Sequence, residues 1–146
     1  MPVVISKSPE ETSAIGESWA REAVSGWVVG LSGDLGAGKT QFVKGFARGL
    51  GYSDRVLSPS FALINEYRGG RIPLFHLDLY RLETREQIRG AGLEEYLFQP
   101  KGVAIVEWIE RWLGADHTIP GTQLRLVRFQ VLGETERQLQ YEDSGR

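Results

Sequence analysis

The sequence predicts a three-layer α/β domain with a mixed central sheet, and two observations support this. Short apolar runs alternate with amphipathic helical patterns along the 146 residues, which is typical of a sheet covered by helices. Two connections between expected strands are too short to contain a crossover helix, so those strands must pair antiparallel. At this length we expect a single domain spanning 1–146.

The first third of the chain predicts a strand, a helix, a strand and a helix. The apolar run 3–5 is a candidate strand. Ser8 then offers a helix N-cap, with Pro9 at the first helical position and Glu11 closing a capping box. The apolar run 27–31 predicts a buried strand. The helix that follows residue 40 should bury the apolar side chains of Phe42, Val43, Phe46, Ala47 and Leu50 and stop at Gly49 or Gly51.

The rest of the chain supplies the other strands of the sheet. Segments 61–67 and 72–77 predict a hairpin, and Pro73 indicates that its second strand starts late. The continuously apolar run 103–106 is typical of a central strand covered on both faces. The other expected elements are a short helix opened by a capping box at Thr84, a second one within 93–98, and an antiparallel pair of strands at 124–132 and 137–141.

The composition excludes several classes of protein. With 41% hydrophobic and 25% charged residues, the chain has the balance of a folded domain. It contains no cysteine, which excludes disulfides, cysteine–zinc sites and thiol catalysis. Its net charge of -2 gives no basic surplus for gripping a nucleic-acid backbone. We therefore expect no strong direct nucleic-acid surface, and any nucleic acid to be held by a partner.

No membrane partner is expected either. Residues 1–12 lack the basic and apolar segments of a secretory signal, and no apolar run approaches the roughly 18 residues that span a bilayer. The expected location is the cytoplasm.

The segment 33–40, GDLGAGKT, fits the pattern G-x-x-x-x-G-K-[ST] in full. Its glycines let backbone N–H groups form a nest for phosphate oxygens, and the following helix adds the positive end of its dipole. Lys39 would reach the β- and γ-phosphates, and the Thr40 hydroxyl would bind Mg²⁺. The motif predicts a P-loop NTPase-like domain. The predicted nucleotide-binding residues are Asp34, Leu35, Gly36, Ala37, Gly38, Lys39, Thr40 and Gln41.

A P-loop also needs an acidic partner for Mg²⁺ at the end of a core strand. Asp78 ends one apolar run and Glu107 ends another. We interpret Asp78 as a metal ligand, whereas Glu107 has the reach either to bind the metal or to orient and deprotonate the attacking water. The predicted metal site is Thr40, Asp78 and Glu107, with Lys39 and Glu107 as the catalytic pair. The sequence leaves open which carboxylate touches the metal directly.

Three features near the predicted site each have two possible interpretations. On a strand His76 shares a face with Asp78, so it either holds that carboxylate in place or is a structural histidine. Ser58 and Ser60 flank a proline in a loop that either senses the γ-phosphate, as in P-loop switches, or is a plain turn. Trp108 either stacks on a ligand or partner or packs beside the sheet.

Taken together, these segments resemble the TsaE family (also called YjeE), bacterial ATPases needed to make tRNA threonylcarbamoyladenosine. The P-loop alone is shared by many families, and the further matches are much more specific. One departure is Ser60, where the family usually has threonine, which keeps a hydroxyl but loses a methyl contact. The matching segments are 33–40, 58–61, 76–82 (HLDLYRL), 92–96 (GLEEY) and 106–108 (VEW), within a region from Glu11 to about Trp112.

The resemblance implies ATP as the nucleotide and Mg²⁺ as the metal, with Lys39, Thr40, Asp78 and Glu107 in the site. It also implies docking on the TsaB–TsaD pair, in which TsaD transfers the threonylcarbamoyl group to position 37 of ANN-decoding tRNAs. The family member hydrolyses ATP to reset that complex and meets tRNA only through it. We therefore expect a P-loop ATPase that is weak or partner-dependent.

Three other functions compete with this interpretation. A small-molecule kinase would use an arginine-bearing lid, which Arg81, Arg85 and Arg89 resemble in spacing, although that spacing is also typical of a solvated helix face. A GTPase switch would carry an Asn-Lys-x-Asp guanine reader, which the sequence lacks. A module that binds nucleotide without hydrolysing it is the third alternative.

Overall fold

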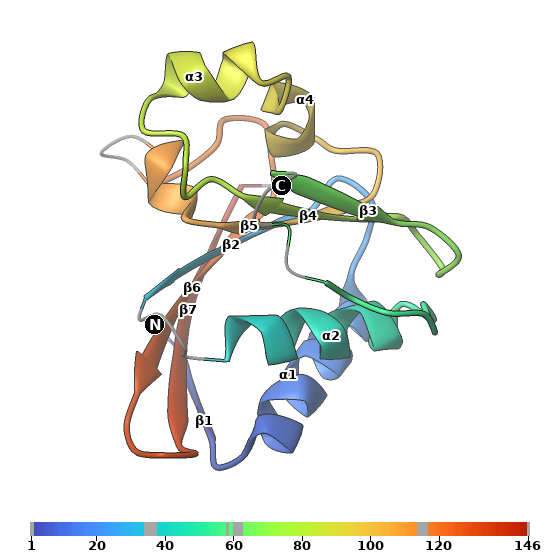
Figure 1. Cartoon of the computed structure of the whole chain (residues 1–146), viewed down its shortest axis with the longest axis vertical. Helices are drawn as coiled ribbons and strands as arrows, with labels where there is room; N and C mark the ends of the chain where they lie inside the picture. The colour runs from blue at the N-terminus through green and yellow to red at the C-terminus, as the bar shows by residue number, and fades with distance from the viewer. Residues whose placement is uncertain (1, 34–37, 58, 60–62, 114–116, 146) are drawn as a thin grey trace.

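A mixed sheet runs through the whole of the computed structural model, which describes residues 2–33, 38–57, 59, 63–113 and 117–145. The sheet has seven strands in the described residues, in the order β1-β7-β6-β2-β5-β4-β3 (Figure 1). In chain order they are β1 (Val3–Ser6), β2 (Val28–Gly33), β3 (Ile64–Tyr67), β4 (Leu74–Asp78), β5 (Val103–Glu107), β6 (Leu124–Val131) and β7 (Arg137–Ser144).

The centre of the sheet is parallel and its edges are antiparallel. Strands β6, β2, β5 and β4 pair in parallel, whereas β3 pairs antiparallel with β4, and β7 pairs antiparallel with both β6 and β1. Val103 to Val106 are fully buried between β2 and β4, as expected for a strand covered on both faces. The predicted mixed sheet is confirmed.

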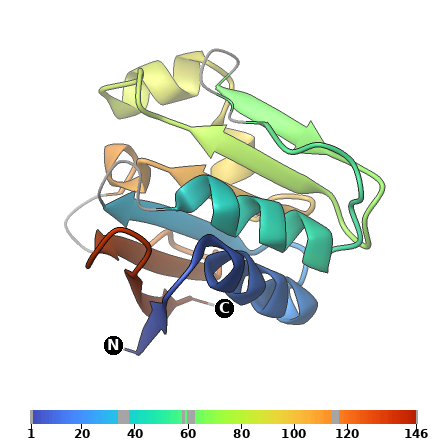
Figure 2. The ribbon, with the colours of Figure 1, turned by 60° about the horizontal axis from the view of Figure 1, so that its bottom comes forward.

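Helices cover both faces and complete the three predicted layers. Helices α1 (Pro9–Glu22) and α2 (Lys39–Gly49) lie side by side on one face, as Figure 2 shows. Helices α3 (Arg85–Gly90) and α4 (Glu94–Leu97) and the 3₁₀ helix η1 (Ile109–Arg111) lie on the other (Figure 1). Each face has its own apolar core. None of the helices in the described ranges is long and apolar enough to cross a membrane.

Local signals place the starts of two helices. The Ser8 hydroxyl accepts a hydrogen bond from the Glu11 N–H at 3.1 Å, so Ser8 is the N-cap of α1 with Pro9 following it. The Glu11 carboxylate reaches back to the N–H of Lys7 at 2.9 Å, one residue before the N-cap. Thr84 caps α3 in the same way, through the N–H of Gln87. Both predicted caps are confirmed.

Two glycines let α1 and α2 pack with their backbones in contact. A Cβ added to Gly45 would lie 1.8 Å from the Ser13 carbonyl oxygen, and one on Gly16 would lie 2.3 Å from that of Phe42. A larger side chain at either position would push the helices apart. This contact therefore sets how α2, and the lysine at its first position, lies against the sheet.

Some element boundaries differ from those predicted. Strand β3 begins at Ile64 in the structure, and residues 61 and 62 of the predicted strand lie outside the described residues. Strand β4 begins at Leu74, directly after Pro73, as the missing proline N–H requires. Strand β7 continues to Ser144, beyond the expected end at 141, because its pairing with β6 extends to the last residues of the hairpin.

Candidate nucleotide-binding and catalytic site

Two carboxylates end neighbouring parallel strands. Asp78 is the last residue of β4 and Glu107 the last of β5, and the two are directly paired in the register of those strands. Glu107 is also paired with Leu31 of β2, two residues before Gly33. Ligand sites of open α/β sheets lie at the carboxyl ends of the strands, where these side chains meet. The structure thus brings together two of the three predicted metal ligands.

Lys39, the first residue of α2, lies beside these carboxylates. Its side chain is 7% exposed, and its ammonium donates a hydrogen bond to the Gly33 carbonyl oxygen at 3.1 Å. The ammonium also lies 5.6 Å from the centre of the Trp108 ring. A lysine at a helix N-terminus next to the end of a strand is where the sequence motif predicts the phosphate-binding lysine, and its contact with phosphate stays a prediction.

The N-terminus of α2 differs from those of α1 and α3. Its N-cap is Gly38, with φ of 91°, and no described side chain caps the helix. Its first turn contains no acidic residue. The first N–H groups of a helix have no intrahelical partner, so here they are left for an external acceptor such as a phosphate.

The predicted site is only partly within the described residues. Gly38 is half-buried, Thr40 is exposed and Gln41 is half-buried, all at the start of α2. Four predicted nucleotide-binding residues, Asp34, Leu35, Gly36 and Ala37, and both residues of the switch-like loop, Ser58 and Ser60, lie outside them. Their roles stay predictions.

His76 contacts Glu107, which corrects the hypothesis that it holds Asp78. Its Nε2 lies 2.6 Å from Glu107 Oε2, and the ring is fully buried. Asp78 instead accepts a hydrogen bond from the Tyr80 N–H at 3.0 Å. The alternation along β4 does put His76 and Asp78 on one face. The neighbouring strand β5 then brings the longer side chain, Glu107, within reach of the imidazole.

The electrostatics of the pair suit a bound cation. Burial raises the pKa of Asp78 above its usual value, and the negative charge of Glu107 raises it further, whereas the Tyr80 N–H and Lys39 oppose the rise. A divalent cation between two carboxylates offsets the repulsion between their negative charges and so favours their ionised forms.

The donor set fits Mg²⁺ held together with a nucleotide. Among the described residues, no three His, Asp or Glu side chains cluster closely enough to hold a metal ion by themselves. Mg²⁺ commonly takes one or two carboxylates and completes its shell with phosphate oxygens and water. The Thr40 hydroxyl with Asp78 and Glu107 matches that incomplete set.

Trp108 forms an aromatic wall beside the site. It follows Glu107 with φ of 60°, and its half-buried ring lies 5.1 Å from Tyr80, which is 54% exposed, and 5.4 Å from the Arg111 guanidinium. The ring also packs against the apolar core on the α3 face, which agrees with packing beside the sheet, and stacking on a ligand or partner stays a prediction. Two residues of η1 lie near these groups: Glu110 interacts electrostatically with Lys39, and Arg111 lies over the Trp108 ring. The sequence analysis did not single out these two residues. The signal that could have found them is the tight turn that follows the acid at the end of β5.

Two of the three arginines with lid-like spacing, Arg85 and Arg89, are engaged elsewhere. Arg85 donates a hydrogen bond from Nε to the Trp112 carbonyl oxygen at 2.6 Å, and its guanidinium lies 5.4 Å from the Trp112 ring. Arg89 lies 5.3 Å from the same ring and pairs with Glu94. These contacts attach α3 to the segment after η1, so they support a structural role and not a lid.

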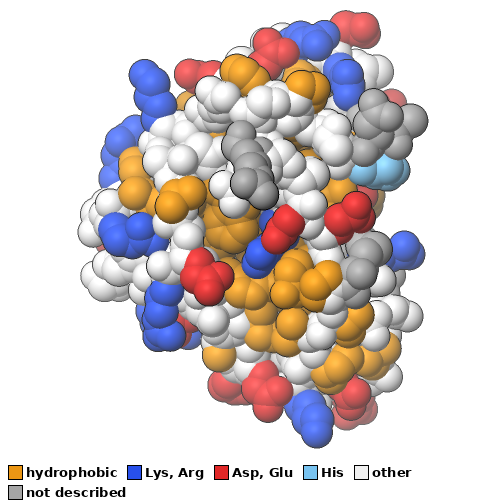
Figure 3. Space-filling model, turned by 180° about the vertical axis from the view of Figure 1, so that it is seen from behind, with side chains coloured by type: hydrophobic (Ala, Val, Ile, Leu, Met, Phe, Trp, Pro, Cys, Tyr) orange, Lys and Arg blue, Asp and Glu red, His pale blue; other side chains and the backbone are white. Residues whose placement is uncertain are grey.

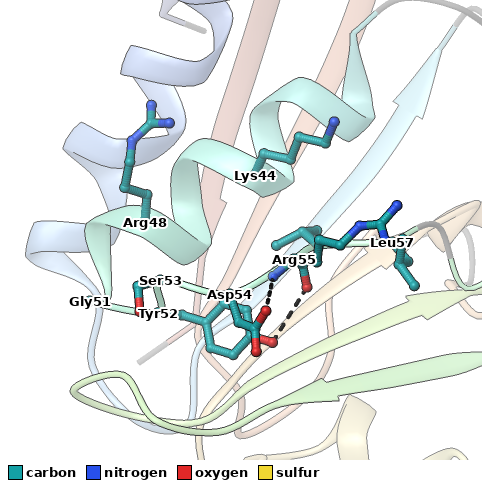
Figure 4. A pocket seen from close by; sticks show the side chains of 9 residues that line it. Lys44, Arg48, Gly51, Tyr52, Ser53, Asp54, Arg55 and Leu57 are labelled. Atoms are coloured by element: carbon teal, nitrogen blue, oxygen red, sulfur yellow. Dashed lines mark hydrogen bonds between the residues drawn. The ribbon is translucent and has the colours of Figure 1, made fainter.

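A hollow of about 600 Å³ lies away from the carboxylates, along the second half of α2 and the segment after it. Figure 4 shows Lys44 and Arg48 on α2 and Arg55 on that segment, with their side chains spread around the opening. It contains none of the predicted site residues. The two carboxylates and the buried lysine lie together elsewhere, at the ends of β4 and β5.

Fold and site together define a class of protein. A mixed sheet whose parallel strands end in two carboxylates, beside a lysine that follows a Gly-rich loop sequence, is the arrangement of a P-loop NTPase-like α/β domain. The family model "Threonylcarbamoyl adenosine biosynthesis protein TsaE" matches residues 6–139. The chain therefore belongs to the TsaE family.

Individual relatives agree with the family match. A tRNA threonylcarbamoyladenosine biosynthesis protein TsaE of Bacillus subtilis (strain 168) is 43% identical over 134 residues, covering 92% of this chain and 80% of that protein. One of Aquifex aeolicus (strain VF5) is 33% identical and covers 93% and 92%. One of Synechocystis is 44% identical over 68% of this chain, which spans 65% of that protein's length.

A solved structure agrees with the fold. The crystal structure of YdiB from Bacillus subtilis superposes with a TM-score of 0.77 at 36% identity, covering 99% of this chain and 86% of that one. The resemblance inferred from the motifs and the predicted fold class are thereby confirmed.

Proposed function

We propose that this chain binds ATP with Mg²⁺ and hydrolyses it during the synthesis of threonylcarbamoyladenosine on tRNA. It docks on the TsaB–TsaD pair and resets that complex by hydrolysis. One observation carries the proposal: Asp78 and Glu107 are paired in register at the ends of β4 and β5, beside the buried Lys39 at the N-terminus of α2. Membership of the TsaE family supports the pathway.

Lys39 and the start of α2 bind the phosphates. The lysine gives up its bond to the Gly33 carbonyl oxygen and pairs with phosphate oxygens, and the uncapped N–H groups of α2 add further donors. Thr40 and Asp78 would hold the metal. When bound, Mg²⁺ neutralises charge on the phosphates and lowers the barrier to phosphoryl transfer.

Glu107 orients the attacking water and accepts its proton. Its side chain is 13% exposed, so the carboxylate lies mostly out of bulk solvent and keeps a defined position. Arg85 and Arg89 are both engaged with Trp112, so neither is placed as an arginine finger, and we propose that the remaining stabilisation of the transition state comes from the partner complex. The isolated chain is therefore a slow ATPase.

The charge of the chain agrees with a role in which tRNA is held by TsaB–TsaD and not by this chain. Its net charge is -2, and Figure 3 shows acidic and basic side chains interspersed on one face, with hydrophobic side chains gathered in its lower half. The cations on that described surface do not merge into one stripe that would follow a phosphate backbone. Contact with tRNA through TsaB–TsaD remains our expectation.

The test is ATP hydrolysis by the purified chain, alone and with added TsaB–TsaD, with GTP as the control. We expect selective stimulation with ATP, and we expect Glu107→Gln to retain nucleotide binding while losing most turnover. Equal rates with and without the partners would overturn partner dependence. Transfer of phosphate to a small-molecule acceptor would move the protein to the kinases.

A further inference from the structure

His76 is a fully buried imidazole at a position where an apolar side chain would be expected. It lies in β4 on the same face as Leu74, and Ile105 is its partner on β5. Leu74 and Ile105 belong to the core beneath α1 and α2. A strand position in this setting is ordinarily filled by a branched apolar residue, which packs without any polar atom to satisfy.

The imidazole makes one strong contact and leaves one atom unsatisfied. Its Nε2 lies 2.6 Å from Glu107 Oε2, whereas its Nδ1 is buried with no hydrogen-bond partner among the described residues. A buried polar atom without a partner costs about 1–3 kcal/mol. Folding alone therefore does not explain a histidine here, and such an atom in a native structure calls for another reason.

The direction of the contact follows from the ionised state of Glu107. An ionised carboxylate can only accept, so Nε2 carries the hydrogen and donates it to Glu107 Oε2. Asp78 has its own donor, the Tyr80 N–H. Each carboxylate is thus held by a separate donor on one oxygen. Among the described residues no donor contacts the second oxygen of Glu107, so this is the oxygen available to accept a hydrogen bond from the attacking water.

We propose that His76 is a positioning residue for Glu107, an inference that rests on the proposed ATPase function. The imidazole is fully buried at a core position of β4, so its Nε2–H fixes one oxygen of the carboxylate and aims the other at the attacking water. Loss of the donor lets the carboxylate rotate about its last side-chain torsion. Water is then oriented poorly while the nucleotide still binds, because Lys39 and the start of α2 are unchanged.

Two variants separate positioning from packing. His76→Leu fills the same space without a donor, and His76→Gln keeps a donor near the place of Nε2. We expect His76→Leu to be folded and to bind ATP within about threefold of wild type, as measured with a fluorescent ATP analogue, while its turnover with TsaB–TsaD falls by at least about tenfold, a change equivalent to ~1.4 kcal/mol. His76→Gln should recover most of that turnover.

A double variant shows whether His76 acts through Glu107. If it does, His76→Leu should cause no further loss of single-turnover rate in a Glu107→Gln background, because the group it positions is already disabled. If the losses of the two single variants multiplied in the double variant, the two residues would act independently and the inference would be overturned. Wild-type turnover in His76→Leu, or an equal fall in its ATP binding and turnover, would also overturn it. Absence of any ATPase in the wild type with its partners would overturn the proposed function itself, and the inference with it.

Discussion

Arg125 of β6 is surrounded by aromatic rings, and its replacement provides the sharpest test of how α1 is held against the β6–β7 hairpin. Its guanidinium carbon lies 4.5 Å from the ring centre of Tyr141, 4.6 Å from that of Trp19 and 5.2 Å from that of Trp27. The same guanidinium makes two bonds to the Asp143 carboxylate, at 2.6 and 2.9 Å. It therefore links α1 and β7 with Trp27, the residue before β2.

The exposure of the partners decides which contact contributes most. The Arg125 side chain is 14% exposed, so its contacts with the rings approach the desolvated value of about 2 kcal/mol per cation–π pair. The three rings share one charge, so we do not add them and expect about 2–3 kcal/mol in total. Asp143 is 57% exposed, and an ion pair of that kind contributes at most about 1 kcal/mol.

The assay is urea unfolding of Arg125→Met, Arg125→Lys and Asp143→Asn, followed by circular dichroism. We expect Arg125→Met to lose about 2–3 kcal/mol, equivalent to roughly 5–10 °C in Tm for a chain of this size. Arg125→Lys keeps the charge but not the planar stacking group, so it should fall between Arg125→Met and wild type. A loss in Asp143→Asn as large as in Arg125→Met would refute the reasoning, because the ion pair and not the rings would then carry the stability.

The remaining predictions concern the site and the packing behind it. Because burial and a neighbouring negative charge raise the folded-state pKa of Asp78, the folded chain binds more protons than the unfolded chain, and stability falls as pH rises through that pKa. Asp78→Asn should thus be more stable than wild type at pH 7, with the gain vanishing below pH 3.8 in urea titrations, yet lose Mg²⁺-dependent turnover. Gly45→Ala should cost about 3 kcal/mol in the same unfolding assay, because its Cβ would lie 1.8 Å from the Ser13 carbonyl oxygen. Gly90→Ala is the matched control, since its Cβ would meet nothing within 4 Å and alanine favours the helix by up to about 1 kcal/mol; similar losses in both would contradict the packing argument. Lys39→Ala should weaken ATP binding by at least about tenfold in calorimetry while the circular dichroism spectrum is unchanged, and an unfolded variant would show that the buried lysine is structural.

Features that depend on neighbours in the chain were predictable from the sequence. The caps at Ser8 and Thr84 form within three residues of the capping side chain, so the residue order alone indicates them. The position of β5 in the centre of the sheet followed from four consecutive apolar residues at 103–106. Asp78 and Glu107 were then predicted as site residues because each directly follows a predicted apolar strand, at the point where the chain leaves the core.

Contacts between distant segments were decided by the tertiary structure. His76 and Glu107 are 31 positions apart, and they meet because β4 and β5 pair in parallel in one register, which no local pattern encodes. The rings around Arg125 come from three separate segments of the chain, so nothing near that residue in the sequence marks it.

The sequence by itself thus determined the class of fold, the phosphate-binding motif and the two acids, since each depends on residue types at short spacing. Only the tertiary structure decided which donor holds which acid. Hydrogen bonds act over about 3 Å, and the strand register that brings side chains within that distance is a property of the whole sheet.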